Sequence, residues 1–324
     1  MRLEFYPDSS ALHYQNKHKT EAMDKPLQAK SIFGSAAGHI GAFLVVSIWG
    51  TTFVSSKVLL NAGLMPADIF FARFLIAYIC MLSVSHKKMI ADSLGDELTM
   101  AGLGLMGGSL YFLTENMALV YSTSSNVSIL VSSTPLLTAI VVSIFYKSER
   151  LTRRQVLGSI VAFIGGVLVV LNGQLVLHLN PAGDTLALSA ALMWAFYSLL
   201  MRRVMDRYST DFITRKVFFY GIITIIPYFF IFHPLDVNPE IWCQPVVIGN
   251  VLFLGLIASS GCYLLWNWVM REVGAVHSTN YIYLQSLITM LFGAIILHER
   301  ITLMGLSGAL ILILGMVGAL MRRK

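Results

Sequence analysis

Apolar residues dominate this chain and fall in long runs separated by short polar stretches. Each run spans about 18 to 22 residues, the length that a helix needs to cross a hydrocarbon core of about 30 Å. The runs predict helices, because a single strand in lipid leaves its backbone unpaired and the alternating pattern of a membrane barrel is absent. The ten predicted spans are 39–59, 67–85, 98–118, 124–146, 155–172, 184–204, 214–232, 246–269, 275–297 and 302–321.

The composition leads to the same fold class. Of the 324 residues, 56% are hydrophobic and only 12% are charged, and the mean hydropathy of +0.72 lies well outside the range of soluble domains. The three cysteines, Cys80, Cys243 and Cys262, have neither the spacing of a metal site nor that of a disulfide framework. We therefore predict an all-α integral membrane protein that needs no metal or other cofactor.

Lys and Arg residues are distributed unevenly between the predicted loops. The loop stretches without any Lys or Arg are 61–67, 120–123, 173–184 and 233–245. Because cytoplasmic loops carry the excess of Lys and Arg, these stretches are predicted outside the cytoplasmic (inner) membrane and both termini inside. The net charge of +6 is then a topology signal, and no nucleic-acid partner is needed to explain it. Lys57, Arg73 and Arg300 are the basic residues that do not fall in a predicted cytoplasmic segment.

The first 38 residues are polar and lack the apolar stretch of a signal peptide, so they are interpreted as a cytoplasmic tail. Residues 1–22 show no apolar periodicity, and Met23 lies shortly before the first predicted helix. Met23 is therefore an alternative translation start.

The chain contains an internal repeat. An offset of 150 positions aligns Glu149 to Thr152 with Glu299 to Thr302, Gly158 with Gly308 and Gly165 with Gly315, and an offset of 145 aligns Trp49 with Trp194 and Lys57 with Arg202. Each half, 39–173 and 184–321, is predicted to contain five helices. An odd number of crossings inverts the second half relative to the first, as in secondary transporters whose solute site lies near the membrane midplane.

These features resemble the EamA-type branch of the drug/metabolite transporter superfamily over about residues 39–321. The residues that carry the resemblance are Trp49-Gly50, Arg73, Tyr121 to Asn126, Pro135, Glu149 to Thr152, Gly158, Glu299 to Thr302 and Gly308. The resemblance implies ten helices with both ends in the cytoplasm, and transport, often outward, of amino acids, other metabolites or drugs. Such proteins commonly have a Glu-Pro pair in the ninth helix; this chain has Gln285-Ser286 instead, so the carboxylate and kink of that pair are not implied.

Glu115 is the acidic residue that lies well inside a predicted span. A charge there costs roughly 2.5 to 3.5 kcal/mol on insertion scales, so it needs a partner or a function. Its helical face also carries Gly104, Gly108, Tyr111 and Ala118. Lys57 and Arg73 are predicted at a similar depth, so an ion pair with either is open. Such a pair would either hold the helices together or form an outer gate that breaks during transport. Asn116 is assigned to the same transport-path and gating group as Glu115.

Aromatic and amide side chains form a second group of candidates. Its members are Trp49, Trp194, Trp266, Asn267, Tyr281, Tyr283 and Gln285. A solute cavity needs apolar walls with a few polar groups that orient the solute, and these residue types fit that need. Trp is also common at membrane interfaces and in helix packing, so a packing role remains the alternative for each of them.

Pro135 in the fourth span removes a backbone hydrogen bond and bends the helix, which predicts a hinge or a packing role. Gly104 and Gly108 have the spacing of close helix contacts. Packing within the chain and a homodimer are both compatible with this spacing.

The motifs of common enzyme classes are missing from the sequence. It contains no GxSxG, no HExxH and no phosphate-binding glycine loop, and no soluble domain that would bind ATP. We therefore expect a secondary transporter in the lipid bilayer and not an enzyme. It is expected to export small organic metabolites, amino acids or drugs by alternating access. A lipid-carrier flippase and a non-transporting membrane scaffold are the alternatives.

Overall fold

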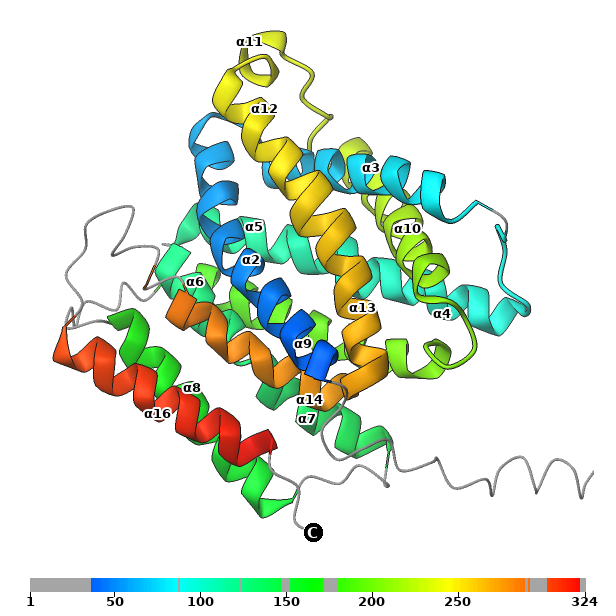
Figure 1. The fold of residues 1–324 in the computed structure, drawn as a ribbon. Helices are drawn as coiled ribbons and strands as arrows, with labels where there is room; N and C mark the ends of the chain where they lie inside the picture. The colour runs from blue at the N-terminus through cyan, green and yellow to red at the C-terminus, as the bar shows by residue number, and fades with distance from the viewer. Residues whose placement is uncertain are drawn as a thin grey trace, which may run out of the picture.

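The computed structural model of this chain describes residues 36–86, 88–122, 124–146, 152–171, 180–288, 291 and 302–320. The described residues form helices joined by short loops (Figure 1). The helices are α2 Ala36–Asn61, α3 Pro66–Val84, α4 Leu94–Gly104, η1 Leu105–Leu110, α5 Tyr111–Tyr121, α6 Ser124–Val131, α7 Thr134–Phe145, α8 Arg153–Leu171, α9 Pro181–Val204, α10 Thr210–Ile231, α11 Pro239–Trp242, α12 Pro245–Leu252, η3 Phe253–Gly261, α13 Cys262–Val273, α14 Ala275–Thr279, η4 Asn280–Tyr283 and α16 Leu303–Leu320.

Six helical spans of the described residues are long and apolar enough to cross a membrane, and α16 contains a shorter apolar helix. The six are Ala36–Asn61, Pro66–Val84, Asn126–Phe145, Pro181–Val204, Thr210–Ile231 and Pro245–Val273. The predicted spans 98–118 and 155–172 are also helical, in the continuous stretch from α4 to α5 and in α8. Most of 289–297, the second part of the ninth predicted span, lies outside the described residues, so the count of ten helices stays a prediction.

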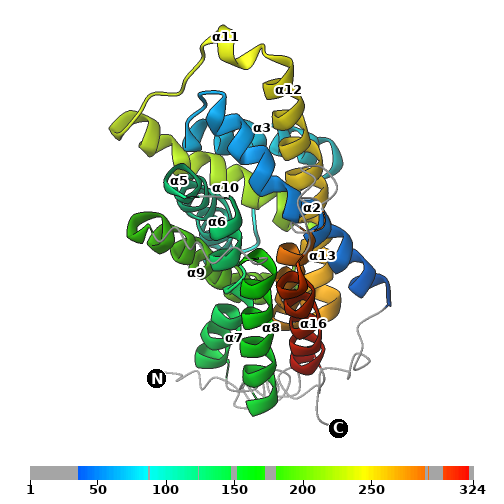
Figure 2. The same ribbon diagram turned by 90° about the vertical axis from the view of Figure 1, so that its left-hand side faces the viewer.

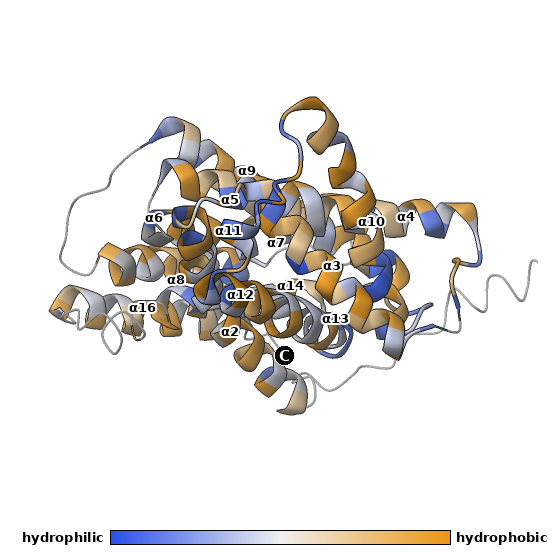
Figure 3. Cartoon of the chain, turned by 90° about the horizontal axis from the view of Figure 1, so that it is seen from above, coloured by the Kyte–Doolittle hydropathy of each residue, from blue (hydrophilic) through white to orange (hydrophobic). Residues whose placement is uncertain are grey.

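Large apolar side chains point outward along the helices, where a soluble protein would carry polar groups. Ile79, Ile144, Phe230 and Leu310 are each more than half exposed. Orange, hydrophobic ribbon extends over the outer helices in Figure 3, and blue is largely confined to loops and helix ends. This surface fits contact with lipid tails, and the chain is an integral membrane protein.

Helices α8 and α16 lie side by side in both Figure 1 and Figure 2 and pack closely through glycines. A Cβ on Gly158 would lie 2.8 Å from the Gly315 carbonyl oxygen, and one on Gly165 would lie 2.8 Å from the Gly308 carbonyl oxygen. The contacts run in opposite chain directions, so the two helices are antiparallel. Small residues allow this backbone approach, as is common between helices in membranes.

Several of the helices are locally irregular. Segments η1 and η3 are π-helical and lie in the middle of two long spans. The fourth predicted span divides into α6 and α7 at Ser132 and Ser133, directly before Pro135. Both kinds of irregularity release backbone carbonyls from the regular α-helical ladder, and such positions recur at functional sites.

One end of the molecule carries a set of contacting charged and aromatic side chains. This set, here called the basic cluster, comprises Lys88, Asp92, Asp96, Glu97, Arg207, Tyr208, Arg215, Lys216, Tyr220 and Arg271. It connects two parts of the chain. One part is the loop after α3 with the start of α4, and the other is the loop before α10, α10 itself and the end of α13. Its members come from loops that were predicted to share the cytoplasmic side.

Some sequence predictions fall on parts of the chain that the structure does not describe. The Glu149 to Leu151 and Glu299 to Ile301 motifs, the 1–35 part of the tail with Met23, and the last four residues lie outside the described residues. They stay predictions.

Candidate functional site

A cavity that is partly open to solvent lies where α2, α3, α5, α9 and α13 meet; the empty space in it and at its opening together is about 400 Å³. It brings together five residues that the sequence singled out: Trp49, Arg73, Glu115, Trp194 and Gln285. The other lining residues are Thr52, Phe53, Tyr111, Phe112, Val131, Thr134, Tyr263 and Ile282. Among the described residues that line it, Arg73 and Glu115 are the charged ones, so the cavity is apolar with one charge of each sign.

Glu115 lies on α5 and is 5% exposed. Its Oε1 atom accepts a hydrogen bond of 3.0 Å from the hydroxyl of Tyr111, one helical turn earlier. No described residue donates a hydrogen bond to its other carboxylate oxygen, Oε2. One oxygen of the carboxylate is therefore held by its own helix, and the other accepts no hydrogen bond from a described residue.

Arg73 reaches the cavity from α3 and is 2% exposed. Its Nε atom donates a 2.9 Å hydrogen bond to the Ser259 hydroxyl, and its Cζ atom lies 4.1 Å from the centre of the Phe112 ring, a cation–π contact. These two contacts fix the plane of the guanidinium. They leave its terminal nitrogens Nη1 and Nη2 without a hydrogen bond to a described residue.

The ion pair that the sequence left open does not form. No nitrogen of Arg73 or Lys57 lies within 4.0 Å of the Glu115 carboxylate, although all three residues are described. Lys57 donates instead to the carbonyl oxygens of Leu119 and Ser122, at the C-terminal end of α5. Its ammonium group caps a helix end, where carbonyl groups attract cations, and its predicted depth stays a prediction.

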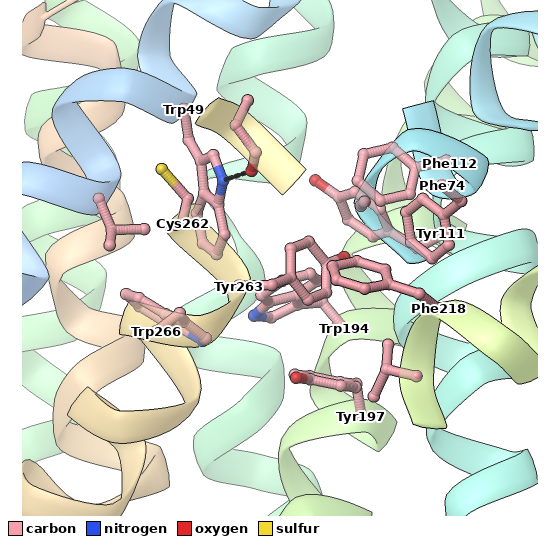
Figure 4. Packing of buried hydrophobic residues seen from close by; sticks show 14 of the residues in the cluster. Trp49, Phe74, Tyr111, Phe112, Trp194, Tyr197, Phe218, Cys262, Tyr263 and Trp266 are labelled. Atoms are coloured by element: carbon pink, nitrogen blue, oxygen red, sulfur yellow. Dashed lines mark hydrogen bonds between the residues drawn. The ribbon is translucent and has the colours of Figure 1, made fainter. Parts of the chain in front are cut away.

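The two π-helical segments supply groups that hold the cavity wall. In η3, the Ala258 carbonyl accepts a 3.0 Å hydrogen bond from Trp49 Nε1, the dashed line in Figure 4, and Ser259 holds Arg73. In η1, the Gly107 carbonyl accepts a hydrogen bond from the Tyr263 hydroxyl. The irregular backbone therefore orients an indole, a guanidinium and a phenol at one place.

Aromatic rings gather around these polar groups (Figure 4). The Trp49 ring lies edge-on to Trp194, with centroids 5.3 Å apart at 87°, and Tyr111 lies 5.1 Å from Trp194. The repeat aligns Trp49 with Trp194, and their rings contact each other in the lining of the cavity. Trp194 Nε1 is buried and has no hydrogen-bond partner in the described structure, so an indole N–H donor is left over at the cavity.

The remaining sequence candidates lie outside the cavity lining. Trp266 packs behind Trp49 at 5.0 Å between centroids, and Asn116 donates to the Pro66 carbonyl at 3.2 Å. Asn267 donates to Thr214 at 2.9 Å. Tyr283 is buried within the core. These four residues pack within the helix bundle, and their place in a transport path stays a prediction.

Tyr281 and Gly108 also have contacts away from the cavity. The Tyr281 hydroxyl shares a 2.6 Å hydrogen bond with His39 Nδ1. A Cβ on Gly108 would lie 3.0 Å from Phe74 and 3.3 Å from the Gly221 Cα atom. The glycine face that also suggested a homodimer is therefore occupied by α3 and α10 of the same chain.

Tyr111, Phe112, Ser259 and Tyr263 are site residues that sequence reasoning did not assign to the path. Tyr111 shares the helical face of Glu115, so its position was recognisable in the sequence. Tyr263 precedes Trp266 by three positions, which is a helical-face signal. Phe112 and Ser259 carry no such signal, because each becomes visible only through its contact with Arg73.

The full helical region of the chain matches a known family. Residues 36–171 and 181–321 each match the EamA-like transporter family. The chain belongs to this family, within the drug/metabolite transporter superfamily. The family and the named relatives are transporters rather than enzymes, and the chain is a membrane transporter of the EamA type.

Relatives from archaea and bacteria cover most of the chain. An "uncharacterized transporter" of Archaeoglobus fulgidus is 28% identical over 284 residues, which are 86% of this chain and 95% of the relative. A "probable amino-acid metabolite efflux pump" of Escherichia coli is 25% identical over 284 residues, 85% of this chain and 92% of the relative. A solved crystal structure with 16% identity has a TM-score of 0.67 and covers 88% of this chain and 97% of its own, which shows a shared fold.

Proposed function

We propose that this EamA-family protein is a secondary transporter that exports small organic metabolites across the cytoplasmic membrane. The observation that carries the proposal is the central cavity, in which Arg73 and Glu115 face the same space without forming an ion pair. Buried charges in a membrane are costly and are retained at solute paths. The relatives named as efflux pumps support the outward direction.

Two inverted five-helix halves, 39–173 and 184–321, are part of the proposal. The glycines aligned by the repeat support it, since Gly158 contacts Gly315 and Gly165 contacts Gly308, so that each contact joins one half to the other. The π-helical segments η1 and η3 support it as well, because they start 148 positions apart, at Leu105 and Phe253, near the offset of the repeat. Alternating access between inverted halves then exposes the cavity to one side at a time.

The basic cluster is the proposed cytoplasmic gate. Arg207 contacts both oxygens of Asp96, at 2.7 and 2.9 Å, and Lys216 contacts Glu97, so each pair joins the first half to the second. Arg215 donates to the Ser85 and Lys88 carbonyls across the same boundary. These contacts close the end of the molecule that the charge distribution predicts to be cytoplasmic, and solute loading from the cytoplasm requires them to separate.

Efflux from liposomes tests the proposal. The purified protein is reconstituted in liposomes loaded with pooled metabolites, and release is measured with and without an imposed pH gradient. We expect release of a subset of the pool above that of protein-free liposomes. Absence of release for every compound, together with scrambling of labelled lipid, contradicts solute transport and supports the lipid-carrier alternative.

Crosslinking tests the gate separately. Cysteines replace Asp96 and Arg207 in a chain whose own cysteines, Cys80, Cys243 and Cys262, are changed to serine, and a reducible reagent then joins the pair. We expect release to stop after crosslinking and to return after reduction. Unchanged release in the crosslinked protein shows that this end does not open during transport.

A further inference from the structure

A chain of buried hydrogen bonds joins three helices between the central cavity and the basic cluster. The Tyr197 hydroxyl on α9 donates to Asn267 Oδ1 on α13, and Asn267 Nδ2 donates to the Thr214 hydroxyl oxygen on α10 at 2.9 Å. The Thr214 hydroxyl donates in turn to the Thr210 carbonyl oxygen at 2.7 Å. Tyr197, Asn267 and Thr214 are each 0% exposed and are here called the polar network.

The hydrogen bonds of the polar network require an amide at its centre. Thr214 uses its single O–H for the Thr210 carbonyl, so toward Asn267 it can only accept. Tyr197 donates its single O–H, so on that side the central residue has to accept. A carboxylate lacks the donor and a leucine lacks both groups, whereas asparagine has one of each. Asn267 therefore ties α9, α13 and α10 together at one point.

The polar network reaches the cavity through its tyrosine. The Tyr197 ring centroid lies 4.9 Å from that of Trp194 and 6.3 Å from that of Tyr263, and both of these residues line the cavity (Figure 4). A Cβ on Gly107 of η1 would collide with the Tyr197 ring, and the Gly107 carbonyl accepts from the Tyr263 hydroxyl. Tyr197 thus contacts the cavity lining and also the first half of the chain.

The other end of the polar network leads into the basic cluster. Thr214 is followed directly by Arg215 and Lys216 on α10. Arg215 donates to the Ser85 carbonyl, and Lys216 contacts Glu97. Both contacts belong to the proposed cytoplasmic gate. Because the three residues are consecutive on one helix, a shift of α10 at Thr214 also moves the two cations.

We infer that Asn267 is a positioning residue that couples the central cavity to the cytoplasmic gate. This inference rests on the proposed function. A solute that contacts Trp194 or Tyr263 displaces the Tyr197 ring, the polar network passes this displacement to α10, and the two cations of α10 separate from the first half. Asn267 does not line the cavity and needs no contact with the solute. Two sites coupled to the usual degree change each other's equilibria by about 5- to 150-fold.

A triple variant separates coupling from packing. Tyr197→Phe, Asn267→Leu and Thr214→Val together remove the polar network and leave none of its three side chains with an unpaired polar group. Since replacing both partners of a buried hydrogen bond by apolar groups of similar shape is nearly neutral, the melting temperature should stay close to that of wild type. Ser198→Ala is the matched control, because its buried hydroxyl bonds within α9, to the Trp194 carbonyl at 3.0 Å.

The labelling rate of a cysteine at the gate measures the coupling. Ser85 is 7% exposed and its carbonyl is held by Arg215, so Ser85→Cys should react with N-ethylmaleimide mainly when the gate opens. The variant is made in a chain whose own Cys80, Cys243 and Cys262 are changed to serine, and labelling is measured with and without the metabolite pool. We expect the pool to raise the rate about 5-fold or more. The control variant should respond equally, and the triple variant should not respond.

A triple variant that melts with wild type and responds fully to the pool overturns the inference, because the polar network then only holds the helices together. If the triple variant does not fold, Tyr197→Phe alone decides. It removes the bond to the amide and keeps the ring, so it should reduce the response to the pool, and a full response in this variant also overturns the inference.

Liposome release distinguishes failure of this inference from failure of transport. Labelling that responds to the pool without release of any compound contradicts the proposed function and leaves the coupling standing. Release by the wild-type protein without any response in labelling leaves transport standing and contradicts the coupling.

Discussion

The central cavity and the basic cluster both hold acidic and basic side chains, but the contacts between these charges differ. In the basic cluster each buried carboxylate contacts a cation, Glu97 with Lys216 and Asp96 with Arg207 at 2.7 Å. In the cavity, Glu115 and Arg73 face the same space without an ion-pair contact. The cluster and the cavity lie along one continuous helix, since Glu97 is at the start of α4 and Glu115 is in α5.

Under the proposed function, this difference separates charges that stabilise a conformation from charges that are available to a solute. When one partner of a buried pair is removed, the other is left uncompensated, and the protein loses stability. Arg73 and Glu115 attract each other across the cavity without contact, so removing one of them should cost less stability than breaking a contacting pair. Changes in the basic cluster should therefore alter melting, and changes in the cavity should alter transport.

The largest effect is expected for Lys216→Met, because it leaves the Glu97 carboxylate without its cation. The Lys216 side chain is 5% exposed and that of Glu97 is 17% exposed, so the expected loss is about 3 kcal/mol in the free energy of unfolding. Unfolding of the detergent-purified protein measures this loss. Adding Glu97→Gln should recover more than half of it, since the uncompensated charge is gone; a double variant as unstable as Lys216→Met contradicts the explanation.

Arg73→Lys should change transport rather than stability. A lysine keeps the positive charge but cannot donate to Ser259 and present paired donors at the same time. Losing one charge-assisted hydrogen bond of about 1.5 kcal/mol corresponds to roughly 10-fold weaker solute binding. Binding and melting of the variant are compared with wild type. A large fall in melting temperature with unchanged binding would show that Arg73 stabilises the fold and does not bind the solute.

Lys57→Met tests a charge that the sequence grouped with Glu115 but the structure places at the end of α5. The ammonium contacts carbonyls of Leu119 and Ser122, so its loss should cost about 1 kcal/mol of stability. Solute release per folded molecule should stay at the wild-type level. A tenfold fall in solute release would contradict this and indicate that Lys57 takes part in transport.

Asp92→Asn should have the smallest effect. Asp92 and Lys88 form an exposed pair in the basic cluster, with side chains 70% and 46% exposed. Pairs of this kind contribute about 0 to 1 kcal/mol. Both the melting temperature and solute release should match wild type, and a loss as large as that of Lys216→Met would show that exposure does not distinguish the pairs.

The sequence predicted those parts of the fold and site that depend on rare residues. Helical spans follow from long apolar runs, and Arg73 and Glu115 stood out because charges inside such runs are uncommon. Trp49 and Trp194 stood out because the repeat aligns them. Four of the five predicted residues in the cavity lining were thus found by scarcity or by repetition, and the fifth, Gln285, was assigned as an amide side chain among aromatic candidates.

Other features of the fold and the site depend on how each helix is rotated about its axis and on which side chains it contacts. The order of residues along the chain does not give this information. The Lys57 side chain reaches the end of α5 instead of Glu115. The π-helical turns of η1 and η3 shift the faces that regular spacing assigns, so Ser259 was missed. Tyr263 was missed because aromatic residues make up 11% of the chain and few of them mark a site.

The most direct test of the central claim compares Glu115→Gln with wild type in two assays. The first is release of the exported compounds of the metabolite pool from liposomes at equal amounts of folded protein, and the second is the melting temperature in detergent. The account predicts at least 10-fold slower release with little change in melting temperature, because no cation of a described residue contacts the Glu115 carboxylate within 4.0 Å. Wild-type release together with a lowered melting temperature would contradict it and make Glu115 a structural residue.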